Sequence, residues 1–201
     1  LQVDHSTQRN SIPDYPDFSR QRNFFVKWNH TMDTRASLSD RFTASVHVGT
    51  SNNFRNNFNS STIDYLSNTF QSNIGWTHLW PGKPFTLAVN LRHAQNTGNR
   101  SFNLTVPALT FNMSRILPFQ RRVSTGRWFE QIGVAYALAF DNQLNTTEER
   151  LYWANLPTLM RELRNGVRQG ATLSSAFKTR FFTVNPEFTV TERWYFERLR
   201  Q

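Results

Sequence analysis

The sequence predicts an all-β fold, an antiparallel transmembrane β-barrel segment of about eight long strands with one helical loop insertion. The first indication is alternation: from Phe182 to Phe196, apolar side chains share one parity, while Thr, Asn, Glu and Arg occupy the other. Strand side chains point to opposite faces in turn, so this segment has one apolar and one polar face. It is also far longer than the usual strand of about 5–6 residues. The third indication is the 18 Phe and 6 Trp, since two aromatic girdles are typical of a barrel wall.

The bulk composition is compatible with one β-barrel domain. The chain has 201 residues and no Cys. Its mean hydropathy is −0.59, and its longest apolar stretch, Ile132–Phe140, is far short of the ~20 residues that a membrane helix needs. Low mean hydropathy does not argue against a barrel, because half of every barrel strand is polar. The chain begins at Leu1 without a signal-peptide pattern, so we expect a mature protein or a piece of a longer one.

The charge is strongly basic, with a formal net charge of +9 and a pI of about 10.8. Such a balance suits a solubility surface, nucleic acid, anionic lipid headgroups or a phosphorylated glycolipid. The 23 Lys and Arg residues are scattered at strand ends and turns, and form no stripe on one element. We therefore expect no nucleic-acid partner.

The first half of the chain is interpreted as a tether followed by four strands. Residues 1–22 are polar, carry Pro13 and Pro16 and show no period, which indicates a polar loop or tether. An Asn- and Ser-rich loop is expected over 51–67, and Trp80–Pro84 has the Pro and Gly of a tight turn. The alternating segments predict strands at about 24–32, 41–50, 68–79 and 85–95.

Two further strands are predicted at about 101–116 and 131–141, with a basic connection over 117–130. The apolar parity of the first of these changes near Pro107, which cannot donate to a ladder, so we expect a bulge there. In the second, Ala and Gly fill the other parity, which indicates close packing against that face.

A helical loop insertion is predicted at about 143–167, with the helix itself at about 147–165. Thr146 and Glu149 have capping-box spacing, Pro157 should split the helix in two, and Gly166 suits its C-terminal end. Strands follow at about 169–178 and 181–196. The barrel wall then spans 23–197 and leaves a tail at 198–201. The two longest loops follow even-numbered strands, so we expect them on the outer side of the membrane.

The sequence offers no catalytic, metal or cofactor site. The five His residues are dispersed, and no G-x-S-x-G, P-loop or G-x-G-x-x-G pattern occurs. Glu187 and Glu192 are better explained as lumen or rim charges than as an acid/base pair. We therefore expect that the protein is not an enzyme.

Three basic residues are candidate lumen-facing positions: Lys27, Arg92 and Arg193 all fall on the polar parity of predicted strands. They could line a polar cavity and meet phosphates. An equally good interpretation pairs them with Glu187 or with Asp residues inside the lumen.

Four segments together resemble the LptD family of lipopolysaccharide-assembly outer-membrane proteins, in its divergent branch. They are Trp28–His30, Phe111–Phe119, Arg127–Val134 and Asn185–Tyr195. The resemblance covers roughly residues 23–197 of this chain and is to the central β-barrel region of the family. The chain lacks the jelly-roll domain, the cysteines and most of the strands of the family pattern, so it resembles a segment of such a protein.

The resemblance implies part of a translocon in the Gram-negative outer membrane that delivers and inserts lipopolysaccharide into the outer leaflet. It implies the partners lipopolysaccharide, an LptE-like plug lipoprotein, periplasmic lipopolysaccharide-bridge proteins and outer-membrane lipid, with no cofactor and no chemical reaction. Two alternatives remain open: a nutrient receptor or porin-type barrel, and a soluble β-sandwich binding module. Only the sandwich would bury the apolar parity against a second sheet.

Overall fold

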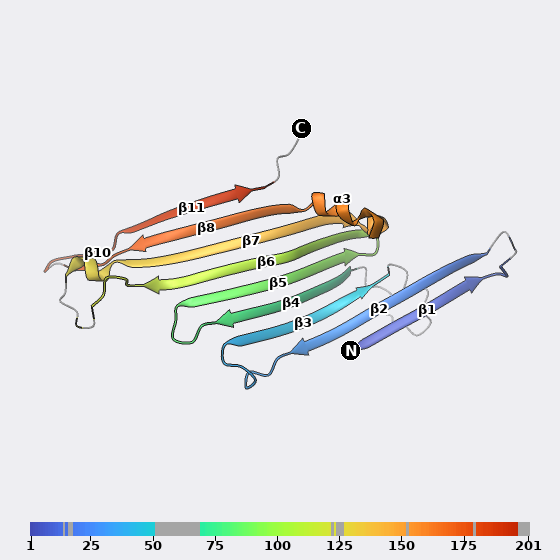
Figure 1. Cartoon of the computed structure of the whole chain (residues 1–201), viewed down its shortest axis with the longest axis horizontal. Coiled ribbons are helices and arrows are strands. Elements are labelled where there is room, and N and C mark those ends of the chain that lie inside the picture. The colour runs from blue at the N-terminus through green and yellow to red at the C-terminus, as the bar shows by residue number, and fades with distance from the viewer. Residues whose placement is uncertain are drawn as a thin grey trace.

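The computed structural model places the long strands in one antiparallel sheet of nine strands, with the order β1-β2-β3-β4-β5-β6-β7-β8-β11 (Figure 1). The structure describes residues 1–13, 15, 18–50, 69–121, 123, 127–151, 153–178 and 180–196. The strands are β1 (Gln2–Asn10), β2 (Ser19–Thr31), β3 (Asp40–Gly49), β4 (Thr69–Leu79), β5 (Phe85–Asn96), β6 (Ser101–Ile116), β7 (Gly133–Thr147), β8 (Arg164–Ser174) and β11 (Glu187–Tyr195). β9 (Phe177–Lys178) and β10 (Thr183–Val184) form a separate two-stranded ribbon.

The helices are short and lie at the ends of the sheet. η1 (Trp128–Gln131) precedes β7, whereas η2 (Glu148–Arg150), η3 (Trp153–Asn155) and α3 (Leu156–Arg161) connect β7 to β8. No helix in the described part of the chain is long and apolar enough to cross a membrane.

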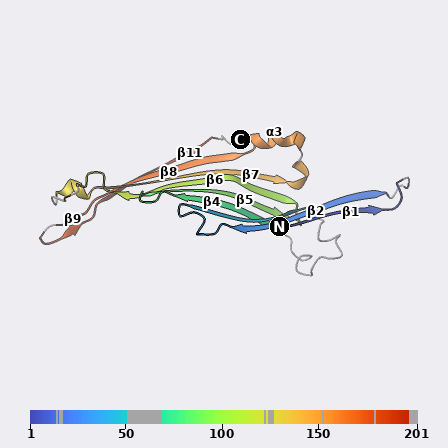
Figure 2. The same cartoon turned by 60° about the horizontal axis from the view of Figure 1, so that its bottom comes forward.

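The sheet is a single layer (Figure 2). Each long strand contacts chiefly its neighbours in the sheet, and α3 contacts chiefly η3. A compact monomer of this mass would expose about 9,800 Å², whereas this chain exposes 15191 Å². Neither face is therefore sealed by a second protein layer formed from the described residues.

The register keeps apolar residues on one face from β2 through β8 to β11. Directly opposed residues of an antiparallel pair share a face, and Val89 lies opposite both Trp76 and Leu109. Trp28 and Val46 are also directly opposed, so they share a face as well. We call this surface the apolar face. Across the sheet, it contains Val26, Trp28, Phe42, Val46, Ile74, Trp76, Leu87, Val89, Leu91, Leu104, Leu109, Phe111, Leu138, Phe140, Val167 and Phe188.

A bulge preserves this pattern at the middle of the sheet. The register of β6 shifts between Thr105 and Ala108 against β7, and β5 shifts between Asn90 and Arg92 against β6. These shifts lie at the position predicted from Pro107. The extra residues reset the parity, so Leu104 and Leu109 reach the same face.

The N-terminal segment is a strand, and the prediction of a loop or tether over 1–22 was wrong. All nine residues of β1 pair with β2, from Gln2 opposite Lys27 to Asn10 opposite Ser19. β1 is mostly polar, so it has no apolar alternation to reveal it. Backbone pairing to β2 forms this strand without a hydrophobic pattern.

The insertion between β7 and β8 is shorter than the predicted 143–167. β7 continues to Thr147 and β8 already begins at Arg164. The expected capping box is absent: Thr146 lies within β7, and the Glu149 carboxylate accepts a hydrogen bond of 2.7 Å from Arg100. Pro157 stands in the first turn of α3 and does not divide a helix. Gly166 lies inside β8.

Two ion pairs involve the insertion, one to a neighbouring turn and one within the insertion itself. The Arg100–Glu149 pair fastens it to the β5–β6 turn, where the Glu148 backbone N–H also donates to the Arg100 carbonyl at 2.9 Å. Arg150 donates to Glu162 across the insertion, and this hydrogen bond raises the pKa of the Arg150 guanidinium. The Arg100–Glu149 pair therefore connects the insertion to the neighbouring turn at this end of the sheet.

The C-terminal strands also differ from the prediction. The expected strands at 169–178 and 181–196 are each interrupted, so that β8 and β11 belong to the main sheet while β9 and β10 pair separately. Pro186 supplies no N–H, and its carbonyl accepts from the Ser175 N–H at 3.0 Å where the two segments part. The expected tail at 198–201 and the loop at 51–67 lie outside the described residues.

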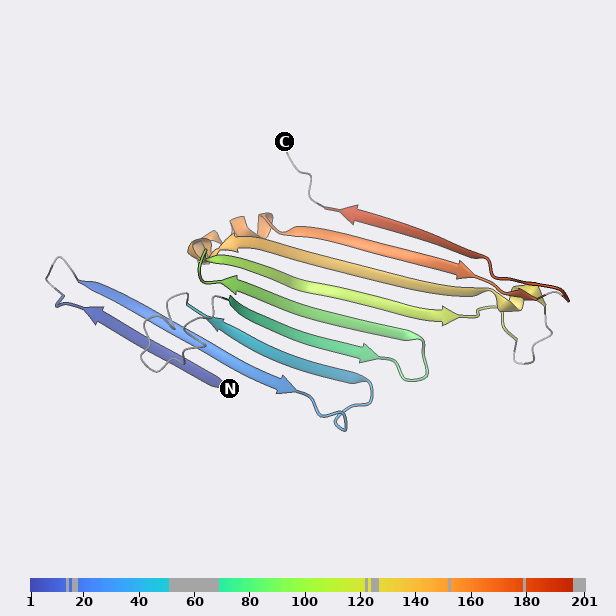
Figure 3. The ribbon, with the colours of Figure 1, turned by 180° about the vertical axis from the view of Figure 1, so that it is seen from behind.

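The insertion at 148–163 lies at the same end of the sheet as the short β5–β6 turn, the end of β3 and the start of β4 (Figure 3). The outer edges of β1 and β11 carry no strand from the described part of the chain, so the sheet is open.

Gly49 offers a test of this register. A Cβ there would lie 2.9 Å from the Phe24 carbonyl oxygen and 3.1 Å from Phe25 Cδ2. Gly49→Ala should therefore force β2 and β3 apart and lower the free energy of unfolding by about 1–3 kcal/mol. Urea titration of the full-length protein folded in detergent measures the change.

Gly170→Ala is the matched control, because its Cβ would lie 3.6 Å from the Val190 carbonyl oxygen, an ordinary contact. We expect a change within about 0.5 kcal/mol. Equal stability of the two variants would contradict the β2–β3 register.

Candidate functional site on the polar face

The face opposite the apolar face is polar, and the same register defines it. Lys27 lies opposite His47, and Arg92 lies opposite Asn73 and Thr105. We call this surface the polar face. It contains Lys27, Asn29, Arg41, Thr43, Ser45, Gln71, Asn73, Thr77, Asn90, Arg92, Asn103, Thr105, Thr110, Asn112, Asp141, Gln143, Arg164, Arg168, Thr172, Thr189, Thr191 and Arg193.

A groove of about 660 Å³ runs over β6, β7, β8 and β11 on this face. Its floor is low because Ala135, Ala137, Ala139 and Gly170 carry little or no side chain there. These are the small residues whose spacing predicted close packing on this side of β7. In the structure, they leave the space that forms the groove.

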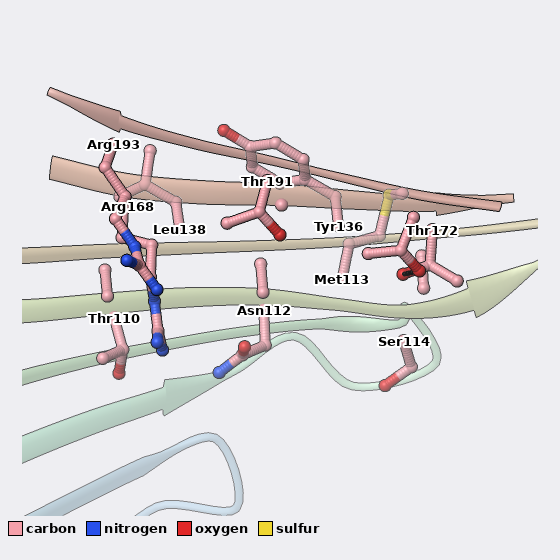
Figure 4. A pocket seen from close by; sticks show the side chains of 15 residues that line it. Thr110, Asn112, Met113, Ser114, Tyr136, Leu138, Arg168, Thr172, Thr191 and Arg193 are labelled. Carbon is pink, nitrogen blue, oxygen red and sulfur yellow. Dashed lines mark hydrogen bonds between the residues drawn. The ribbon is translucent and has the colours of Figure 1, made fainter.

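Hydroxyl, amide and guanidinium groups surround that floor. The groove is lined by Thr110, Asn112, Ser114, Arg168, Thr172, Thr189, Thr191 and Arg193. Figure 4 shows Arg168 and Arg193 extending over the groove toward the strand that carries Thr110 and Asn112. A second hollow of about 540 Å³ continues it and shares Arg168 and Arg193, adding Asp141, Arg164 and Tyr195.

The three predicted basic residues all lie on the polar face, but the structure does not bring them together. Arg193 lies in the groove on β11. Arg92, on β5, lies 3.9 Å from the Asp141 carboxylate on β7, which is the pairing with Asp that the sequence left open. Lys27, on β2, is exposed and far across the sheet from the groove.

Sequence reasoning missed Arg168, which lies directly opposite Arg193 in the β8–β11 ladder. The predicted strand began at residue 169, so Arg168 fell just outside it. The signal was present in the alternation of Arg164, Gly166, Arg168 and Gly170, which all share the polar parity. Extending the strand backwards by this parity finds both the arginine and the glycine beside it.

The described residues contain no cluster of His, Asp or Glu that could hold a metal ion. The groove can accept hydrogen bonds and donate them through its hydroxyl and amide groups, and it can bind anions through its guanidinium groups. These are properties of a binding surface.

Comparison with protein families identifies the chain. A family model described as LptD protein matches residues 1–201. The chain belongs to the LptD family. This confirms the resemblance found at Phe111–Phe119 and the other three segments, and extends it to the N-terminal residues that include β1.

LptD proteins take part in lipopolysaccharide transport and assembly, and they are not an enzyme family. No curated protein and no solved structure matches the chain significantly. The polar groove therefore belongs to an open nine-stranded antiparallel sheet of an LptD-related region.

The coupling energy of the Arg92–Asp141 pair tests whether the polar face is exposed to water. The two side chains are 58% and 53% exposed, so water screens their attraction and we expect a coupling energy of about 0.2–1 kcal/mol. A double-mutant cycle of Arg92→Ala and Asp141→Ala, measured by urea unfolding, gives that energy. A coupling of about 3–5 kcal/mol would instead indicate a pair shielded from water.

Proposed function

We propose that this sheet is part of the wall of a transmembrane β-barrel whose apolar face meets lipid and whose polar face lines a wet lumen. The observation that carries the proposal is the uncovered apolar face, which continues across eight strands, β2 to β8 and β11, without a second layer among the described residues. A soluble protein rarely exposes so large a continuous apolar surface. A β-sandwich would require a second sheet against it.

Aromatic rings along the apolar face support a membrane boundary. Ring contacts run from Trp76 to His78 at 5.8 Å, from His78 to Trp80 at 4.5 Å and from Trp80 to Phe85 at 6.3 Å. They continue from Phe85 to Phe111 at 6.0 Å and from Phe111 to Tyr136 at 6.3 Å. Such a row is typical of the girdle at one membrane interface.

An aromatic pair lies on the same face nearer the insertion, where the rings of Phe102 on β6 and His93 on β5 are 4.5 Å apart. Phe102 precedes Phe111 by nine residues. At about 3.3 Å per residue this spacing is roughly 30 Å, close to the apolar band of about 25 Å in outer-membrane barrels.

Several polar groups on the apolar face are paired with each other. Glu192 accepts hydrogen bonds from Gln169 Nε2 at 2.8 Å and from Trp194 Nε1 at 3.3 Å, and Tyr136 donates to Gln169 at 2.8 Å. Near the turns, His78 and Asp40 are hydrogen bonded at 2.7 Å. Pairing reduces the cost of placing such groups beside hydrocarbon.

Closure of the barrel requires strands beyond this sheet. Nine strands that alternate in direction leave β1 and β11 running the same way, so direct pairing of the two edges would break the antiparallel order. Bacterial outer-membrane barrels are antiparallel, with an even number of strands. We therefore infer that an odd number of further strands completes the barrel.

In this barrel, the sheet guides lipopolysaccharide to the outer leaflet of a Gram-negative outer membrane. Hydrocarbon lies against the apolar face, while hydroxyl, amide and basic groups of the polar face solvate the saccharide and attract its phosphates. No bond is made or broken. An LptE-like plug lipoprotein, periplasmic lipopolysaccharide-bridge proteins and outer-membrane lipid are the partners that the family resemblance implies.

A paired substitution tests the membrane orientation. Val89→Arg places a charge at the middle of the apolar face, where it should cost about 2–4 kcal/mol in a bilayer. Ala88→Arg places it on the neighbouring polar position and should be tolerated. Folding of the full-length protein into lipid vesicles, followed by urea titration, measures both. Equal tolerance of the two changes would refute the orientation.

Depletion of the full-length protein tests the transport role. We expect newly made lipopolysaccharide to reach the cell surface more slowly, and a photo-crosslinking residue at Asn112 to capture it in transit. The solute-uptake alternative predicts the reverse: normal surface lipopolysaccharide with reduced entry of small solutes. That result would favour a porin or nutrient receptor.

A further inference from the structure

The strongest unexplained feature of the polar face is an arginine pair without a counter-ion. Arg168 and Arg193 are directly opposed on β8 and β11, a position in which Cβ atoms lie about 4.5–5.5 Å apart and like charges destabilise a sheet. Neither side chain forms an ion pair with a described residue. Arg92 differs, because the Asp141 carboxylate lies 3.9 Å from its guanidinium group.

The surroundings of the pair suit an anion carried on a polar ring. Thr172 and Thr189 hydroxyls are hydrogen bonded to each other at 3.1 Å, which leaves one of the two protons free for a ligand. Thr191 and Asn112 add further donors and acceptors along the groove. Two guanidinium groups can hold one phosphate through paired N–H···O bonds.

The size of the groove distinguishes a phosphorylated sugar from phosphate alone. Its volume of about 660 Å³ falls in the range of about 300–1,000 Å³ found for small-molecule sites, far more than one phosphate fills. The floor of Ala137 and Gly170 gives depth below the arginines. Tyr195, exposed beside Arg193 in the adjoining hollow, offers a ring against which a sugar can stack.

We propose that Arg168 and Arg193, with the threonine-lined groove between β6 and β11, form a binding subsite for a phosphate group carried on a saccharide. This inference rests on the proposed lumen-facing orientation and names one position at which the transported glycolipid is held. An anion bridging the two guanidinium groups would relieve their repulsion. The subsite therefore binds the phosphorylated sugars of the lipid and leaves its acyl chains outside.

Binding of lipopolysaccharide to the full-length protein in detergent tests the subsite. Arg168→Gln and Arg193→Gln should each weaken binding about ten- to hundredfold, because each removes hydrogen bonds to a charged group. Arg35→Gln removes the same charge from the exposed β2–β3 turn, outside the polar face, and should change binding by less than about threefold. An equal loss of affinity in all three variants would show that binding depends only on net charge and would overturn the proposal.

Two comparisons separate the sources of the phosphate. Lipopolysaccharide treated with phosphatase should bind the wild-type protein about as weakly as the intact lipid binds the Gln variants. Inorganic phosphate should compete only at much higher concentration. Competition by inorganic phosphate as strong as that by the lipid would show a simple anion site and overturn the saccharide part of the proposal.

The double variant Arg168→Lys with Arg193→Lys keeps both charges and decides the matter if the Gln variants do not fold. We expect several-fold weaker binding, since ammonium groups lack the planar fork. Binding equal to that of the wild type would overturn the guanidinium clamp. Normal surface delivery of lipopolysaccharide by variants that have lost this binding would refute the subsite and leave the transport role standing. Binding by the wild-type protein together with normal surface delivery after its depletion would refute the transport role.

Discussion

The structure depends on one constraint: the alternation of side chains stays in phase from one strand to the next across nine strands. The ladder enforces it locally, since each residue of β5 has fixed partners on β4 and β6. One residue of slippage would move a whole strand's apolar set to the other face. The bulge around Pro107 shows the constraint at work, because it restores the phase where the sequence itself changes parity.

Much of the fold could be predicted from this alternation, and the failures have a common cause. β6 was predicted with its observed limits, Ser101–Ile116, because its apolar residues mark it clearly. β1 was missed because polar residues fill both of its faces and only its backbone pairing with β2 forms it. β7 was predicted too short because its last residues are mostly Asn, Gln and Thr. A search for alternating apolar residues cannot detect such a polar strand end.

The site was harder to predict than the fold, because it depends on pairs of strands. Parity placed Lys27, Arg92 and Arg193 on the polar face, but only the register shows that Arg92 reaches Asp141 and that Arg193 faces Arg168. The groove likewise follows from three adjacent elements, since Ala and Gly on β7 and β8 matter only beside the longer side chains of β6 and β11. A single strand carries no such information.

The most direct test is to measure which face of β5 meets hydrocarbon. The chain contains no Cys, so single cysteines at positions 86–91 can be spin labelled in an otherwise cysteine-free full-length protein reconstituted in lipid. We expect period-two alternation, with Leu87, Val89 and Leu91 reached by oxygen dissolved in the bilayer and the residues between them reached by a water-soluble nickel reagent. Labels at the apolar positions that are shielded from both reagents would instead indicate a covering protein layer and contradict the membrane-facing sheet.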